Sequence, residues 1–204
     1  MTRFVLASSS PYKRDLLKRL GLDFECRAAD IDESAPDDEA PEQTARRLAR
    51  AKAEKVAAEF SEAWVIGADQ VVALEQRRFH KPGGEVRARE QLSELAGKTH
   101  RLIAATALIT PRGRLFEDLL EHKMQMRPLT PDQIAAYVEE DEPYDCAGSY
   151  KIEAGGIRLF RALRGDDYTA IVGLPLTRVY ALLEHAGFFE AYADESTSGD
   201  EKVP

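Results

Sequence analysis

The sequence of 204 residues contains little cysteine, little histidine and no long apolar run. Its two cysteines, Cys26 and Cys146, are far apart and form no Cys-x-x-Cys pair, so neither a zinc site nor a disulfide framework is indicated. We interpret them as buried thiols in a protein of a reducing compartment. The 4 histidines share no ligand spacing, which argues against a histidine metal site and against a catalytic triad.

The sequence also has no apolar segment typical of a transmembrane helix or of a signal peptide. No apolar stretch approaches the roughly 18 residues of a transmembrane helix. The apolar run Phe4–Ala7 is too short for the core of a signal peptide. We therefore expect a cytoplasmic protein with no membrane partner.

Positive charge is in deficit. The chain has 28 Lys and Arg against 36 Asp and Glu, a net charge of −8. Nucleic-acid-binding proteins depend on an excess of cationic side chains, so we expect no nucleic-acid partner. A local group of lysines would still suffice for a small polyphosphate. The remaining composition, 44% hydrophobic and 31% charged, is ordinary for a globular protein.

Helical and strand patterns alternate along the chain. Helix patterns cover residues 11–20, 41–60, 86–96, 130–142 and 175–185, and strand patterns cover 3–7, 24–27, 64–74, 101–110, 115–127, 156–163 and 168–172. The clearest helix start is Thr130, where Pro131 and Gln133 complete a capping box. The two long strands joined at Pro111-Arg112-Gly113 predict a hairpin. The fold class we expect is therefore α/β with a mixed sheet, flanked by helices.

The length fits a single large domain. We place that domain at residues 1–190, since no repeat or long linker interrupts the pattern. The segment 191–204 has little apolar content and is predicted to be a disordered tail.

The most informative segment is the first one. A short apolar run leads into Ser8-Ser9-Ser10, and Pro11, Lys13 and Arg14 follow directly. This order predicts a buried strand, a tight turn and the start of a helix. Hydroxyls, cations and free backbone N–H groups at a helix start suit a phosphate group. The alternative is an ordinary capped helix with solvated charges.

Two carboxylates are candidates for chemistry. Asp69 ends the apolar strand Trp64–Ala68, where an α/β protein commonly places ligands. Such a carboxylate can accept a proton from water or bind a divalent metal, or it can simply cap a turn. Glu33 lies in an acidic loop, which is either a solvated surface or the source of a second metal ligand beside Asp69.

Three further positions each allow two interpretations. Lys52 falls on the apolar face of its helix, so it either reaches out to solvent or points into a cleft. Lys81 precedes Pro82 and is either a phosphate contact or a solvated turn residue. Glu153 precedes Ala154-Gly155-Gly156 and either faces a pocket or lies on the surface.

Seven blocks in order resemble the Maf family of nucleotide pyrophosphatases, over about residues 3–187. The blocks are Leu6-Ala7-Ser8-Ser9-Ser10-Pro11-Tyr12-Lys13-Arg14, Ile31-Asp32-Glu33, Leu48-Ala49-Arg50-Ala51-Lys52-Ala53, Gly67-Ala68-Asp69-Gln70, Lys81-Pro82, Cys146-Ala147-Gly148-Ser149-Tyr150 and Val172-Gly173-Leu174-Pro175-Leu176. The variants around Asp69-Gln70 and Cys146 are similar to the branch that hydrolyses 7-methyl-GTP. The branch that acts on dTTP and UTP typically has Asp-Thr at the first of these positions.

The resemblance implies an elongated, twisted mixed sheet with two lobes around a central cleft, as in inosine triphosphatases. It implies hydrolysis of a nucleoside triphosphate to the monophosphate and pyrophosphate, a divalent cation (Mg²⁺ or Mn²⁺), and commonly a homodimer. By position it makes Asp69 the catalytic proton acceptor and a metal contact, with Glu33 as the second metal contact. The phosphate-binding residues would be Ser8, Ser10, Lys13, Arg14, Lys52 and Lys81, and the specificity residues Tyr12, Gln70 and Glu153.

Two positions depart from the family pattern. Lys13 stands where the family often has arginine, which keeps the charge but loses the planar two-donor fork. Tyr12 stands where the methyl-GTP branch is expected to have tryptophan. An aromatic ring can still stack on the cationic 7-methylguanine, Glu153 can pair with its charge, and Gln70 can donate or accept at its edge.

Two other functions compete with this one. The first is pyrophosphatase activity on dTTP and UTP, or on other modified nucleotides. Gln70 argues against dTTP and UTP as substrates. The second is a non-catalytic nucleotide-binding regulator of septum formation. Release of pyrophosphate from a series of triphosphates separates the three.

Overall fold

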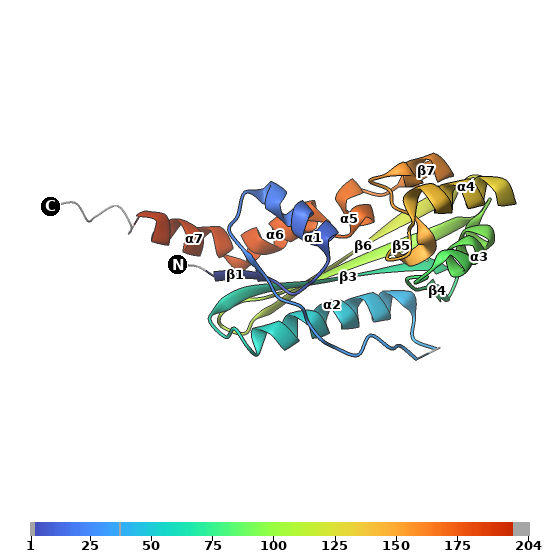
Figure 1. Cartoon of the computed structure of the whole chain (residues 1–204). Helices are drawn as coiled ribbons and strands as arrows, with labels where there is room; N and C mark the ends of the chain where they lie inside the picture. Colours follow the sequence, from blue (N-terminus) through green and yellow to red (C-terminus); the bar gives the residue numbers. More distant parts are fainter. Residues whose placement is uncertain (1–2, 37, 198–204) are drawn as a thin grey trace.

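The computed structural model describes residues 3–36 and 38–197. Its elements follow the order β1 (Arg3–Leu6), α1 (Pro11–Leu17), η1 (Lys18–Leu20), β2 (Glu25–Cys26), α2 (Pro41–Ala57), β3 (Ala63–Leu74), β4 (Arg77–Phe79), α3 (Glu85–Leu95), β5 (Thr99–Ile109), β6 (Leu115–Met126), α4 (Pro131–Asp141), η2 (Ala147–Ser149), η3 (Gly155–Leu159), β7 (Phe160–Arg164), α5 (Tyr168–Val172), α6 (Leu176–Ala186) and α7 (Phe188–Thr197). Figure 1 shows them along one elongated sheet.

The sheet is mixed, as the sequence predicts. Its strand order is β2-β1-β3-β5-β6-β7, with β4 paired to β3. Strands β2, β1 and β3 run parallel, whereas the pairs β3/β5, β5/β6, β6/β7 and β3/β4 are antiparallel. Three of these strands are 11 or 12 residues long, which gives the molecule its length.

Strand β3 changes its neighbour on one side halfway along. Its first four residues pair with β1 up to Leu6↔Ile66, and its last three residues pair with β4 from Val72↔Phe79 onward. Between these pairings, residues 67–71 have β5 on one side and no described strand on the other. Because Asp69 lies in this interval, its side chain comes from the interior of a strand and not from the strand end that the sequence predicts.

Helix α2 covers one face of the sheet at very close range. Its buried residues toward the strand are small, among them Ala45, Ala49 and Ala53. On the strand, a Cβ added to Gly67 would lie 2.2 Å from the Ala49 carbonyl oxygen and 2.7 Å from the Ala53 nitrogen. Glycine therefore permits this approach, and Lys52, on the same helix, comes within reach of β3.

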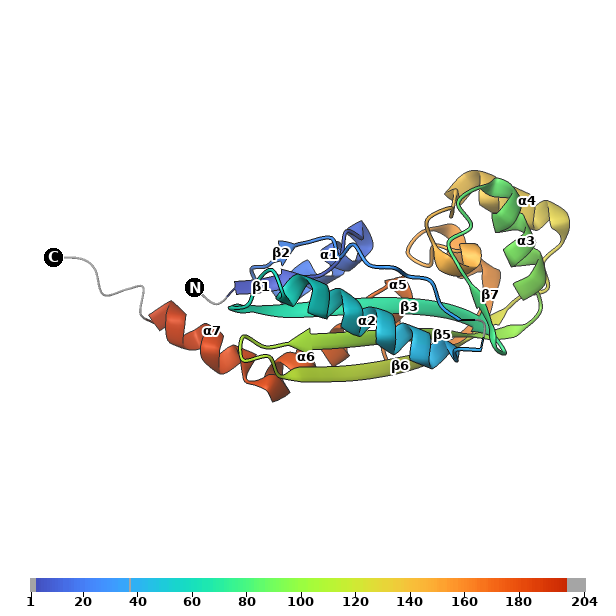
Figure 2. The ribbon, with the colours of Figure 1, turned by 90° about the horizontal axis from the view of Figure 1, so that it is seen from below.

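The rest of the molecule forms two lobes at the ends of the long strands (Figure 2). One lobe packs α1, α6 and α7 around an apolar cluster that includes Phe4, Ile66 and Phe188. The other packs α3 and α4 around a cluster that includes Leu92, Tyr137 and Phe160. The expected two-lobed arrangement is thus present.

Local signals explain several helix boundaries. The Thr130 hydroxyl accepts a hydrogen bond from the Gln133 backbone N–H at 3.3 Å, and the Gln133 side-chain oxygen accepts one from the Thr130 backbone N–H at 2.9 Å. These two bonds confirm the predicted capping box. The predicted strand over 168–172 is wrong. Asp167 caps that segment as helix α5 by accepting from Thr169 N–H at 2.8 Å.

Two further boundaries differ from the sequence prediction. The segment expected as a strand over 156–163 begins as the 3₁₀ helix η3, and β7 starts only at Phe160. At the C-terminus the chain is helical to Thr197, because Phe188 anchors α7 in the apolar cluster. The remainder of the predicted tail, 198–204, lies outside the described residues. No helix in the described part of the chain is long and apolar enough to cross a membrane.

Candidate active site

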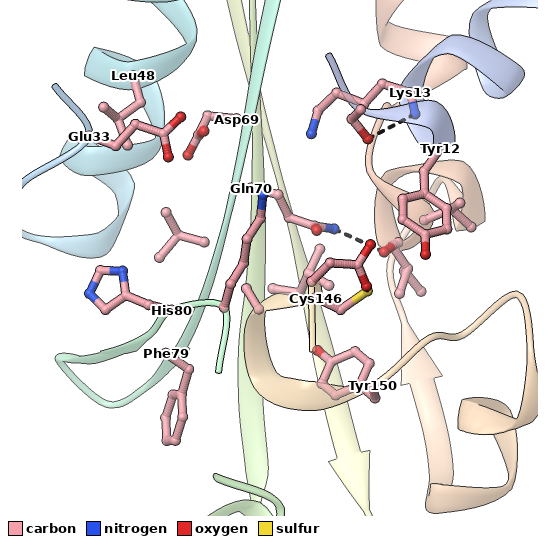
Figure 3. A pocket seen from close by; sticks show the side chains of 18 of the residues that line it. Tyr12, Lys13, Glu33, Leu48, Asp69, Gln70, Phe79, His80, Cys146 and Tyr150 are labelled. Carbon is pink, nitrogen blue, oxygen red and sulfur yellow. Dashed lines mark hydrogen bonds between the residues drawn. The ribbon is translucent and has the colours of Figure 1, made fainter. Parts of the chain in front are cut away.

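A cavity of about 450 Å³ opens between the two lobes, alongside the unpaired interval of β3. The residues that line it come from the loop and helix at α1, the loop before α2, α2 itself, β3, β4 and the segment after it, the loop after α4, and α5. Figure 3 shows the side chains of Glu33 and Asp69 facing each other, with Gln70, Tyr12 and Cys146 further along the cavity. Residues distant in the sequence thus meet in one place.

A lysine joins two carboxylates on one side of the cavity. The Nζ of Lys52 lies 2.6 Å from Oδ1 of Asp69 and 2.7 Å from Oε1 of Glu33. The side chains of Lys52 and Asp69 are 14% and 11% exposed, whereas that of Glu33 is 56% exposed. Of the two interpretations of Lys52, the structure therefore supports the one in which it points into a cleft.

The ionisation of this group reflects its burial. Burial raises the pKa of Asp69, although the charges of Lys52 and Lys13 oppose the shift. Burial lowers the pKa of Lys52, but the attraction of Asp69 and the hydrogen bonds to Asp69 and Glu33 outweigh it, so the pKa is raised overall. Lys52 is therefore a firmly protonated cation, and Asp69 is more basic than an ordinary aspartate.

Two more lysines line the same part of the cavity. Burial lowers the pKa of Lys13; Asp69 attracts its charge, and the charges of Lys52 and Lys81 repel it. Lys81 is exposed at the rim. Three cations thus face two carboxylates, and the excess positive charge favours an anionic ligand.

Not every predicted phosphate-binding residue lines the cavity. Ser10 does, and its hydroxyl also caps α1 by accepting from Lys13 N–H at 3.4 Å. The hydroxyl of Ser8 accepts from Ser10 N–H at 3.1 Å and so shapes the turn instead. Arg14 is paired with Asp15 at 3.4 Å outside the cavity. Ser9, which lies between the predicted serines, does line it.

The three predicted specificity residues all line the cavity, away from the Lys52 cluster. Burial raises the pKa of Tyr12, and the charges of Cys146 and Asp145 add to the shift. Burial also raises the pKa of Glu153. The Gln70 side chain donates to the backbone carbonyls of Ala170 and Ile171 at 2.8 and 2.9 Å.

Several lining residues were missed by the sequence reasoning. Asp145 directly precedes the quoted Cys146 block, and Arg78 lies three positions before Lys81. The Arg78 guanidinium donates to the Glu39 carbonyl and the Thr44 hydroxyl, both at 2.8 Å, and so holds the loop that carries Glu33. The sequence signal that could have identified both residues is their position just before the blocks that begin at Cys146 and Lys81.

The two cysteines and His100 offer no competing chemistry. Both thiols are free and partly buried, less than the sequence predicts. Burial raises the pKa of Cys146 to about 12, so its thiol is not a nucleophile near neutral pH. Burial lowers the pKa of His100 to about 4. In the described part of the chain no three His, Cys, Asp or Glu residues are grouped as a metal site.

A Mg²⁺ ion needs fewer protein ligands than a site built from three or more His, Cys, Asp or Glu residues, and this smaller set fits the cavity. Magnesium commonly takes only one or two protein carboxylates, and phosphate oxygens and water complete its shell. The carboxylates of Glu33 and Asp69 already converge on one cationic group, the Lys52 ammonium. Their oxygens are hard ligands beside an open cavity, so the residues present suit a divalent cation.

Fold and site together define a two-lobed α/β protein whose interlobe cavity combines lysines with a buried, basic carboxylate. The family model described as "Maf-like protein" matches residues 3–186. The chain belongs to the Maf family.

Curated relatives agree along nearly the whole chain. The chain is 46% identical to a 7-methyl-GTP pyrophosphatase of Xanthomonas campestris over 92% of this chain and 98% of that protein. It is 43% identical, with the same coverage, to a protein of that name from Pseudomonas syringae. Among solved structures it is similar to the Staphylococcus aureus Ham1 protein, with a TM-score of 0.53 and 14% identity over 91% of this chain and 100% of that one. This last likeness concerns the fold alone.

Proposed function

We propose that this protein is a nucleoside triphosphate pyrophosphatase that hydrolyses 7-methyl-GTP to 7-methyl-GMP and pyrophosphate. The observation that carries the proposal is the division of one cavity into two unlike ends. One end holds Lys52 between Asp69 and Glu33, and the other holds Tyr12 and Glu153. The Maf relatives named 7-methyl-GTP pyrophosphatase support it over their full length.

Asp69 is the proton acceptor in this proposal. A water oxygen bonds to the α-phosphorus, the bond from that phosphorus to the bridging oxygen of the β-phosphate breaks, and Asp69 takes the proton of the water. The pyrophosphate leaves with the bonding electron pair. Burial makes the Asp69 carboxylate more basic, and a more basic carboxylate is the better general base.

The lysines bind the phosphates. Lys13 and Lys52 lie inside the cavity and Lys81 lies at its rim, so they bracket an elongated anion. Burial lowers the pKa of Lys13, repulsion from Lys52 and Lys81 adds to this shift, and an incoming triphosphate relieves that repulsion. Fixed cations stabilise the charge that develops on the phosphate oxygens during attack. Ser10 and Ser9 border the same space, and Ser8 and Arg14 contribute through the turn around it.

Glu33 and Asp69 would hold a divalent cation, Mg²⁺ or Mn²⁺. When bound, such an ion neutralises phosphate charge and lowers the pKa of a coordinated water. In the structure Lys52 bridges these two carboxylates.

The opposite end of the cavity suits a cationic base. Methylation at N7 gives guanine a positive charge, and the Tyr12 ring offers a π face for stacking on it. Glu153 supplies a charge-assisted contact, and Asp145 adds a second carboxylate nearby. Unmethylated GTP lacks that charge, so we expect the enzyme to prefer the methylated nucleotide.

The decisive experiment is a series of nucleotides with Mg²⁺, namely 7-methyl-GTP, GTP, dTTP and UTP, with pyrophosphate and monophosphate measured in each. The proposal predicts the highest kcat/KM for 7-methyl-GTP and one pyrophosphate per monophosphate. A preference for dTTP or UTP would place the chain in the other activity of the family. Binding without product would make it a nucleotide-binding regulator.

A cytoplasmic location and a homodimer complete the proposal. Free thiols at both Cys26 and Cys146 suit a reducing compartment. Light scattering of the purified protein tests the dimer.

A further inference from the structure

Asp167 is a buried carboxylate that the proposed chemistry does not use. It is 5% exposed and accepts four hydrogen bonds. One oxygen accepts from the backbone N–H and hydroxyl of Thr169, at 2.8 and 2.5 Å, and the other from the same groups of Thr177, at 2.8 and 2.7 Å. Asp167 therefore ties the first turn of α5 to the first turn of α6.

Helix α5 in turn fixes the side chain of Gln70. The Gln70 Nε2 donates to the carbonyls of Ala170 and Ile171 at 2.8 and 2.9 Å. Carbonyl oxygens only accept hydrogen bonds, so the amide NH₂ must face α5 and Oε1 must face away. Within the described part of the chain, no group donates to this Oε1, and Gln70 lines the cavity.

The consequence is an end of the cavity that is rich in hydrogen-bond acceptors. Gln70 offers Oε1, and Glu153 and Asp145 offer carboxylate oxygens. A base that presents N–H donors is matched to these groups, and guanine presents its N2 amino group as a donor. A base that presents only acceptors would leave the Gln70 oxygen unsatisfied.

We propose that Asp167 is a positioning residue for recognition of the base: through α5 it orients the Gln70 amide so that Oε1 accepts an N–H of the nucleobase. The inference rests on the proposed function and deepens it. It assigns the base end to purines that carry N–H donors, and it places the control of Gln70 about 100 positions away in the chain.

The test is a double-mutant cycle between Asp167→Ala and Gln70→Ala, with the affinity for 7-methyl-GMP measured by calorimetry. We expect Asp167→Ala to weaken binding on the order of tenfold, the worth of one strong hydrogen bond. In the Gln70→Ala background, we expect the same change to alter the affinity less than twofold. Asp167→Asn keeps the volume and covers the case in which Asp167→Ala fails to fold.

The matched control is Thr130→Ala, which removes the cap of a different helix, α4, whose Thr130 does not line the cavity. It should lower Tm and leave the affinity unchanged. Equal effects of Asp167→Asn in both Gln70 backgrounds would overturn the inference, because Asp167 would then act on the fold alone. Missing pyrophosphate release overturns the proposed function by itself, and a wild type that does not bind 7-methyl-GMP overturns the inference about Asp167.

Discussion

Replacing Gly67 by alanine tests whether the close contact of α2 with β3 builds the site. The new Cβ would lie 2.2 Å from the Ala49 carbonyl oxygen and 2.7 Å from the Ala53 nitrogen, both backbone atoms. Ordinary contact begins at 3.4 Å, so helix and strand must separate by about 1.2 Å. Overpacking of this kind costs about 3 kcal/mol, which corresponds to a drop in Tm of about 6–12 °C for a chain of this size.

The same separation should reach the catalytic group. Lys52 lies on α2 between the two alanines, and its 2.6 Å bond to Asp69 would lengthen. A displacement of about 1 Å can reduce turnover on the order of 100-fold. The assay combines thermal unfolding with kcat for 7-methyl-GTP.

Gly84→Ala is the control for this prediction. A Cβ at Gly84 meets nothing within 4 Å, and its backbone is extended. Its Tm and kcat should therefore match the wild type. If Gly67→Ala behaves like Gly84→Ala in both measurements, close packing of α2 on β3 does not hold the site in place.

Two further predictions concern charge. Lys52→Met should lower kcat/KM on the order of 100-fold. It should also move the acid limb of the pH–rate profile to higher pH, because Asp69 loses the cation that opposes its raised pKa. Turnover within threefold of wild type would contradict this prediction. His100 has a folded pKa of about 4, lowered by burial from 6.5, so the unfolded chain binds the proton first and stability falls as pH drops from 6.5 toward 4. Urea unfolding at pH 7 and 4.5 should show about 2 kcal/mol less loss in His100→Gln than in the wild type, and equal losses in the two proteins would refute it.

Periodic patterns predicted most of the architecture. The strand patterns over 101–110 and 115–127 indicated the hairpin that β5 and β6 form, and the Thr130 box indicated a helix start because a cap depends only on neighbours in the sequence. Residues 168–172 were mistaken for a strand, since an apolar run of five carries no clear period. The cap from Asp167 decided in favour of a helix.

The sequence predicted which residues belong to the site better than it predicted the hydrogen bonds and ion pairs between them. Lys52, Asp69 and Glu33 were candidates from the sequence, yet only the folded chain shows one lysine bonded to both carboxylates. Whether Gln70 donates or accepts could not be predicted, because the carbonyls that orient it lie about 100 positions away. Ser8 and Arg14 are also expected at the phosphates; in the structure neither lines the cavity, and Ser8 accepts from Ser10 N–H while Arg14 pairs with Asp15.

The most direct test of the account is Asp69→Asn, with pyrophosphate release from 7-methyl-GTP compared against Asp118→Asn. Asp118 is a carboxylate of β6 outside the cavity, paired with Arg178 at 3.5 Å. We predict that Asp69→Asn retains its circular dichroism spectrum and nucleotide affinity but loses turnover, while Asp118→Asn keeps wild-type turnover. Near-normal turnover by Asp69→Asn would contradict the role of Asp69 as the group that accepts the proton from water.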